Sequence, residues 1–204
     1  MALASFNEFD DMHLSVLQEL GNMGSGGAAT ALATMLNTAT DISVPTVRKI
    51  GKQDAIRLIA ALCAGSHPLL IKLGGDFGGY ILHLLPYAYI ERVVQTYFPD
   101  VPVKSAADIN EMTGSVINET VNITSAAYAN SLAELSGMCV DISTPERVTD
   151  MGAEIFRTYP PSEDTIFFVN NSIVIKDAGC TGNMVYFPEL NSVCEMMNRI
   201  GVPC

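Results

Sequence analysis

The sequence has few basic residues. Its 204 residues include 11 lysines and arginines against 22 aspartates and glutamates, which gives a net charge of −11. A surface with this charge repels nucleic-acid phosphates and anionic lipids, which argues against roles that depend on binding either. No apolar run approaches the ~20 residues that a membrane-spanning helix requires, and no basic stretch marks a signal peptide at the N-terminus. We therefore expect a cytoplasmic protein that does not insert into membranes.

Clustered metal ligands are also lacking. The five cysteines are an odd number, are widely spaced and form no C-x-x-C pair, and there are only three histidines. A structural zinc site needs several such ligands close together, so the spacing predicts no metal of the protein's own. The pattern predicts reduced, mostly buried thiols of the cytosolic kind at all five positions: Cys63, Cys139, Cys180, Cys194 and Cys204.

The familiar catalytic motifs are absent too. The chain has no P-loop, no G-x-G-x-x-G after a strand, no G-x-S-x-G nucleophile elbow and no H-E-x-x-H. Apolar residues, in contrast, are plentiful: 49% of the residues are hydrophobic and 16% are charged. This composition excludes disorder and allows a large core, in one medium-sized domain or two small fused ones.

The chain contains an internal repeat at an offset of 100 residues. Residues 15–45 and 115–145 align without a gap and share twelve identities over 31 positions, far above the roughly one in fifteen expected from composition. A weaker match follows, in which a glycine opens a strand and a proline begins a helix. The pattern predicts a single domain, residues 1–204, made of two tandem repeats at about 8–97 and 105–201.

Each repeat predicts the same order of elements: a long helix, a strand, a short helix, two strands and a final helix. The expected helices span about 8–37, 53–64, 87–97, 107–135, 148–157 and 189–199. The expected strands lie near 42–47, 69–73, 80–85, 140–143, 165–175 and 184–187. Neither half has enough strands to close a sheet alone. We therefore predict an α/β (α+β) fold of two layers, in which tandem-duplicated halves share one sheet about a pseudo-two-fold axis and each carries a long motif helix.

A polar stripe recurs on the two long helices. The spacing i, i+4 and i+7 places Ser15, Glu19 and Asn22 on one side of the first helix. The second helix presents the same residues at the same spacing: Ser115, Glu119 and Asn122. A single copy is typical of a solvated helix face, but a solvated face does not require asparagine, which helices disfavour, to recur in register.

The stripe predicts half of an active site. An asparagine amide both donates and accepts hydrogen bonds, so it can orient a water, while a glutamate can pair with a cation or act as a base. No nucleophile, histidine or phosphate-binding loop lies nearby in the sequence. We therefore expect groups from another molecule to complete the site.

The spacing Ser-x3-Glu-x2-Asn, followed after 22 residues by proline, occurs in both halves. It resembles the signature of the CheC/CheX/FliY phosphatases of bacterial and archaeal chemotaxis, and ELGNMGSGGAATALATML is similar to the glycine-rich helix of the CheC type. The resemblance covers essentially the whole chain. It implies hydrolysis of the aspartyl phosphate on the response regulator CheY.

The resemblance also implies a role for each motif residue. Asn22 and Asn122 would position the attacking water, and Glu19 and Glu119 would pair with a lysine of the regulator. Magnesium would belong to the regulator, so the chain would have no cofactor of its own. The remaining motif residues are expected to support the helix surface or the chain that enters a strand: Ser15, Pro45, Ser115 and Pro145.

The subtype indicated by the resemblance is CheC. FliY-like members carry added segments that this chain does not show, and CheX-like members have one site per chain and dimerise. CheC-type proteins also bind the receptor deamidase CheD through the second half, where the corresponding helix would span about 148–157.

Three alternatives remain open from the sequence. The chain could be a non-catalytic module that binds phospho-CheY or CheD, related to the middle domain of the flagellar switch protein FliM. It could also serve chiefly as a scaffold for CheD. Finally, Tyr128 stands where the first repeat has Ala28, and this tyrosine either lines a docking surface, which would make the two sites unequal, or fills the core.

Overall fold

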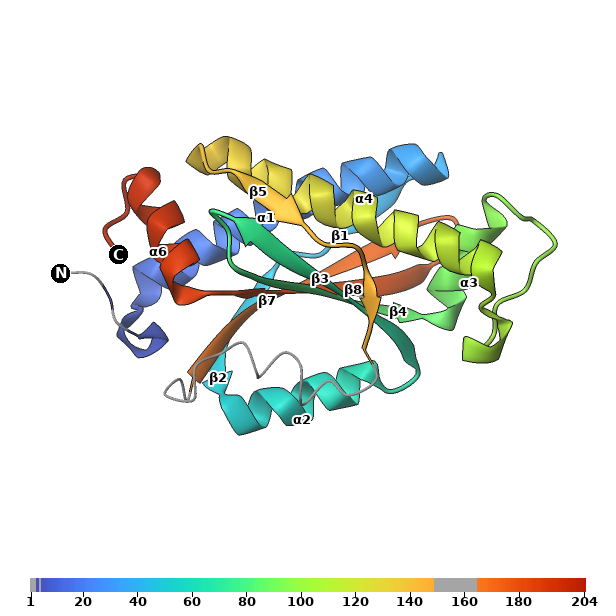
Figure 1. Ribbon diagram of the computed structural model, residues 1–204, viewed down its shortest axis with the longest axis horizontal. Helices are drawn as coiled ribbons and strands as arrows, with labels where there is room; N and C mark the ends of the chain where they lie inside the picture. Colours follow the sequence, from blue (N-terminus) through green and yellow to red (C-terminus); the bar gives the residue numbers. More distant parts are fainter. Residues whose placement is uncertain (1–2, 4, 149–164) are drawn as a thin grey trace.

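One antiparallel sheet forms the centre of the protein. The computed structural model describes residues 3, 5–148 and 165–204. Two long helices cover one face of the sheet and a shorter helix covers the other (Figure 1).

The strand order is β1-β7-β8-β4-β3-β5, with β2 pairing β7 and β6 pairing β3. The strands are β1 Thr40–Ile42, β2 Thr46–Gly51, β3 Ser66–Gly75, β4 Gly79–Pro86, β5 Val140–Ile142, β6 Glu146–Arg147, β7 Thr165–Ile175 and β8 Cys180–Pro188. The predicted α/β (α+β) class is confirmed.

The two halves of the chain exchange strands. β4 and β8 pair at the centre, from Gly79 opposite Pro188 to Leu84 opposite Asn183. The short strands β1 and β2 of the first half pair with β7 of the second, while β5 and β6 of the second half pair with β3 of the first. Each half therefore supplies the outer strands of the other, which explains why neither half has a complete sheet. The repeat boundaries themselves stay a prediction.

The long helices are α1 (Asp11–Leu36) and α4 (Glu111–Ser136). Each begins after a residue whose side chain accepts hydrogen bonds from the first-turn backbone. Asp10 accepts from two N–H groups of α1, and Asn110 accepts from one N–H group of α4. These caps satisfy donors that have no partner within the helix, so they define where the helix starts.

The helices start later than the sequence predicts. Residues assigned to the start of the long helices form separate 3₁₀ turns instead, at Phe6–Glu8 and Ala106–Asp108. Each turn ends before the capping residue, because an N-cap has an extended backbone conformation that interrupts a helix. At the other end, Asn37 and Gly137 terminate the helices in the left-handed conformation, with φ of 48° and 63°.

The shorter elements match the predicted order closely. The expected strand at 42–47 is two strands, β1 and β2, because Ser43, Val44 and Pro45 leave the ladder between them. The helix expected at 148–157 lies outside the described residues from 149 onward. The other helices are α2 Lys52–Cys63, α3 Tyr87–Gln95 and α6 Leu190–Arg199.

Apolar side chains fill both sides of the sheet. One cluster packs between the sheet and α1 and α4, with members such as Leu32, Val121 and Ile81. A second cluster joins strand residues to residues of α2, α6 and the N-terminal turn, with members such as Ile59 and Leu82. Ile81 and Leu82 are neighbours on one strand and point to opposite faces, as the pleat requires. No helix in the described part of the chain is long and apolar enough to span a membrane.

The prediction of five reduced thiols is wrong for two of them. Cys194 of α6 forms a disulfide with Cys204, and their Cα atoms lie 4.9 Å apart. The C-terminal residues fold back along α6, where the backbone N–H of Cys204 donates to the Asn198 side chain. This return of the chain is a tertiary feature that cysteine spacing does not reveal. The remaining thiols are free, two of them part-buried and one exposed: Cys63, Cys180 and Cys139.

Helices α1 and α4 approach closely where one has a glycine and the other a tyrosine. A Cβ atom at Gly24 would lie 2.6 Å from Cε2 of Tyr128. The Tyr128 side chain is fully buried and meets the Tyr186 ring edge-on, with 5.8 Å between ring centroids. Of the two alternatives for Tyr128, the structure supports the core. The glycine at position 24 is therefore required by the shape of its neighbour.

Gly24→Ala should destabilise the protein, whereas Gly26→Ala should not. Alanine favours a helix over glycine by about 1 kcal/mol, and nothing lies within 4 Å of a Cβ at Gly26. At Gly24 the same methyl group meets the buried Tyr128 ring, and such overpacking costs about 1–3 kcal/mol. Urea unfolding of both variants measures the difference. Equal changes in the free energy of unfolding would contradict this account of the helix contact.

Candidate functional site

The polar stripe of α1 faces solvent. Ser15, Glu19 and Asn22 are all exposed, while Leu17 and Leu20 on the opposite side are buried. The Ser15 hydroxyl donates to the backbone carbonyl one turn earlier, at 2.8 Å. No described residue hydrogen-bonds or ion-pairs with the side chain of Glu19 or Asn22. The carboxylate and the amide are therefore available to a partner.

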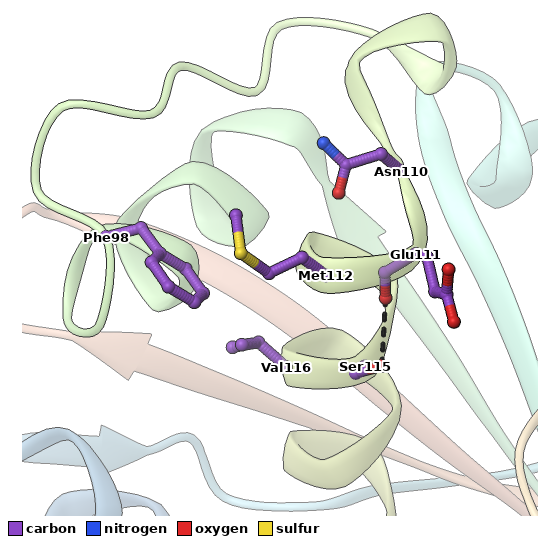
Figure 2. Close-up of a pocket in the computed structure, with 6 residues that line it drawn as sticks. All are labelled: Phe98, Asn110, Glu111, Met112, Ser115 and Val116. Atoms are coloured by element: carbon purple, nitrogen blue, oxygen red, sulfur yellow. Dashed lines mark hydrogen bonds between the residues drawn. The ribbon is translucent and has the colours of Figure 1, made fainter.

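The stripe of α4 is nearly the same. Ser115 and Glu119 are exposed, and the Ser115 hydroxyl donates to the Glu111 carbonyl at 2.8 Å (Figure 2). Asn122 is half-buried, whereas its counterpart Asn22 is exposed. Among the described residues, neither Glu119 nor Asn122 has a hydrogen-bond or ion-pair partner. The structure thus presents two carboxylate–amide pairs on two neighbouring helices (Figure 1).

The motif prolines lie beside the helices rather than on the stripes. Pro45 is buried and directly precedes β2. A Cβ atom at Gly21 would lie 3.2 Å from Cβ of Pro45 and 2.6 Å from Cγ1 of Val169. Pro45 therefore packs against α1 at Gly21, the residue that directly precedes Asn22. Pro145 is half-buried and precedes β6 in the same way.

Two buried serines connect the motif helices to the sheet by hydrogen bonds. Ser25 and Ser125 each follow a stripe asparagine by three residues, so each lies about one helical turn away. The Ser25 hydroxyl donates to Oδ1 of Asn171 on β7. Ser125 hydrogen-bonds Nε2 of His83 on β4, at 2.7 Å. The sequence shows both serines as identities of the repeat but assigns them no function, because their partners come from distant strands.

His83 is an uncharged partner. It is fully enclosed between the sheet and α4, and burial lowers the pKa of its imidazole to about 3. A neutral imidazole can hydrogen-bond a serine without a buried charge that would need compensation. The Ser125–His83 contact therefore holds α4 in place across the neutral pH range.

A surface hollow borders the second stripe. One part, of about 660 Å³, is lined by residues from the start of α4 and the segment after α3 (Figure 2): Phe98, Asn110, Glu111, Met112, Ser115 and Val116. An adjoining part, of about 290 Å³, is lined by the end of α1, the same segment and α4: Met35, Tyr97, Ser115, Val116 and Glu119. This groove is not predicted from the sequence, where its one visible signal is that Met12 and Met112 match at the repeat offset.

The stripes carry two hydroxyls, two carboxylates and two amides. In the described part of the chain, no group of three His, Cys, Asp or Glu side chains could hold a metal ion. The carboxylate can pair with a cation, and the amide can orient a water. The arrangement is therefore suited to act on a group that another molecule presents.

Comparison with known proteins identifies relatives of this arrangement. A model of the CheC-like family matches residues 12–48, which hold the first stripe and Pro45. The CheY-P phosphatase CheC of Bacillus subtilis is 24% identical over 151 residues, covering 73% of this chain and 72% of that protein. CheC1 of Halobacterium salinarum is 24% identical over 194 residues, covering 94% of this chain and 97% of that protein.

Solved structures show the same fold. FliY of Thermotoga maritima superposes with a TM-score of 0.71 at 18% identity, covering 95% of this chain and 98% of that one. The FliM middle domain of H. pylori gives a TM-score of 0.66 at 7% identity, covering 94% and 99%. At these identities the superpositions establish the fold alone. Together with the sequence relatives, they confirm the resemblance to the CheC/CheX/FliY family.

The His83 contact predicts a pH dependence of stability. In the unfolded chain the His83 imidazole has an ordinary pKa near 6.5 and is protonated below that pH. In the folded protein its pKa is about 3, so it stays neutral until the pH falls to that value. The contribution of His83 to the free energy of unfolding is complete above pH 6.5 and decreases as the pH falls below that value. Between pH 7 and pH 5, wild type should lose about 2 kcal/mol more of its free energy of unfolding than His83→Gln does.

Urea titrations at the two pH values test this difference. The comparison removes the contribution of His67, whose pKa is also lowered by burial, because both proteins retain it. Parallel losses in wild type and His83→Gln would show that His83 is not held neutral in the folded protein.

Proposed function

We propose that this chain, which resembles the CheC/CheX/FliY family, is a phosphatase that hydrolyses the aspartyl phosphate of a CheY-type response regulator. The observation that carries the proposal is the duplicated pair of side chains, Glu19 with Asn22 and Glu119 with Asn122, of which Asn122 is half-buried and the others are exposed, and none of which is satisfied by a described residue. The relatives named CheC support the same activity.

The asparagines would position the attacking water. The amide oxygen of Asn22 or Asn122 can accept a hydrogen bond from a water and direct its lone pair toward phosphorus. As the bond from water oxygen to phosphorus forms, the bond from phosphorus to the aspartyl oxygen breaks, releasing inorganic phosphate and a free carboxylate. Such a reaction depends mainly on positioning and charge neutralisation, so an amide suffices on this side.

The glutamates would orient the regulator. A carboxylate on a helix surface pairs well with a lysine ammonium, which would place the acyl phosphate next to the asparagine. The regulator would supply magnesium to neutralise the phosphoryl oxygens, and the chain would need no cofactor of its own. The stripe serines already donate to their own helices, which supports a role in the helix surface rather than in the chemistry.

The proposal includes a cytoplasmic location, where response regulators act. CheD binding stays a prediction, since the helix expected at 148–157 lies outside the described residues from 149 onward. A non-catalytic module like the FliM middle domain is the competing function, because that domain shares the fold. The presence of both Glu–Asn pairs on two helices, without partners among the described residues, favours hydrolysis over binding alone.

The double variant Asn22→Ala plus Asn122→Ala should lose the activity. Removing the group that orients the reacting water lowers the rate by a factor of about 100 or more. The measurement is the decay of phosphorylated CheY with the protein present at substoichiometric amounts, which separates turnover from stoichiometric binding.

A matched control is Thr30→Ala plus Asn130→Ala, an exposed pair at the same repeat offset on the same helices. This control should accelerate decay as wild type does. Decay that is equally fast with the asparagine double variant would refute the proposed site. Protection of phospho-CheY by wild type, without turnover, would favour the binding module.

A further inference from the structure

Exposed apolar side chains gather around the motif helices. Six large hydrophobic side chains of the described chain are strongly exposed, and all lie on α1, on α4 or on loops that border them: Met12, Met23, Val44, Tyr97, Met112 and Leu135. Of these, Tyr97 and Met112 line the hollows beside the stripe of α4, which the proposed function uses. Exposed apolar groups that lie together mark a surface for a partner.

The groove beside the second stripe combines apolar walls with acidic groups. Tyr97 is 49% exposed and Met112 is 47% exposed. Glu111 and Glu119 line the same hollows, as does Ser115 of the stripe. A partner that fills this groove therefore buries apolar surface while it places a cation against a carboxylate, and it does so in contact with the stripe itself.

The surroundings of the two stripes differ beside the ends of the long helices. The Tyr97 hydroxyl donates to the carbonyl of Met35 at the end of α1. In the other half Arg199, the last residue of α6, donates to the carbonyl of Gly137, just beyond the end of α4, and also forms an ion pair with Glu195. The aromatic ring of Tyr97 therefore lies beside the second stripe, whereas the residue that makes the comparable hydrogen bond in the other half is Arg199, with a guanidinium group.

We propose that the groove formed by Met35, Tyr97, Phe98, Met112 and Val116 is the docking surface for the phosphorylated receiver domain, and that it makes the second stripe the higher-affinity site. This inference rests on the proposed function. The occupant is the face of the receiver that carries the phospho-aspartate, because the groove is continuous with Ser115 and Glu119 of the stripe and its carboxylates Glu111 and Glu119 would pair with the lysine that the proposed function assigns to the regulator.

The groove residues act on binding rather than on chemistry. Truncating a half-exposed aromatic or methionine at the centre of an interface costs more than 1 kcal/mol of binding, which corresponds to a five- to tenfold weaker complex. Because these side chains contact the partner outside the reacting atoms, KM should rise while kcat stays unchanged.

Single-site backgrounds separate the two stripes. Asn22→Ala leaves only the second stripe active, and Asn122→Ala leaves only the first. In the Asn22→Ala background, adding Tyr97→Ala or Met112→Ala should raise KM for phospho-CheY about five- to tenfold at unchanged kcat. In the Asn122→Ala background, the same substitutions should leave KM unchanged.

The repeat offers matched controls. Met12→Ala and Leu135→Ala remove the equivalents of Met112 and Met35 at the first stripe, so in the Asn22→Ala background they should have no effect. Tyr97→Phe keeps the ring and should retain the low KM, which distinguishes loss of the apolar surface from loss of the bond to Met35.

The outcomes are distinguishable from failure of the proposed function. If the asparagine double variant is inactive but Tyr97→Ala and Met112→Ala leave KM unchanged, the groove proposal is overturned while the phosphatase stands. An unchanged KM together with loss of self-association, measured by sedimentation, would also overturn it and assign the groove to a second copy of the chain. Activity in the asparagine double variant would contradict both the proposed phosphatase site and the groove proposal that rests on it.

Discussion

The antiparallel pairing of β4 with β8 is the constraint on which the rest of the structure depends. It joins the two halves at the centre of the sheet, and the exchanged outer strands then tie each half to the other. Separating the halves would leave unpaired strand edges and would expose the apolar faces of both long helices to solvent. The two stripes therefore belong to one rigid body, whose surface a partner can approach at either helix (Figure 1).

Divergence between the repeats is what allows this body to pack. In a two-fold contact of identical helices, position 24 of each would meet the side chain at position 28 of the other; here Gly24 receives Tyr128, where the first repeat has Ala28. The buried serines show the same division, since Ser25 binds an amide and Ser125 binds a neutral imidazole. The duplicated residues keep their positions, and their neighbours have become complementary. Packing density favours such pairs of large and small side chains.

The chemistry of the stripes suits an incomplete site. A carboxylate and an amide can orient a cation and a water around a group that another molecule presents. An acidic surface with net charge −11 does not attract free phosphate compounds or nucleic acid. Selectivity must then come from the surface around the stripe, where exposed apolar groups and carboxylates lie together. The proposed groove supplies such a surface at the second stripe.

The sequence by itself determined the α/β class, the order of elements and the exposure of Ser15, Glu19 and Ser115, because these depend on periodicity within one helix or strand. Tertiary structure decided the rest. The Cys194–Cys204 bond and the partners of the buried serines join residues that only the folded chain brings together. The groove likewise needs the end of α1, the segment after α3 and the start of α4 to meet. Local patterns describe one element at a time, whereas a surface or a buried contact depends on several.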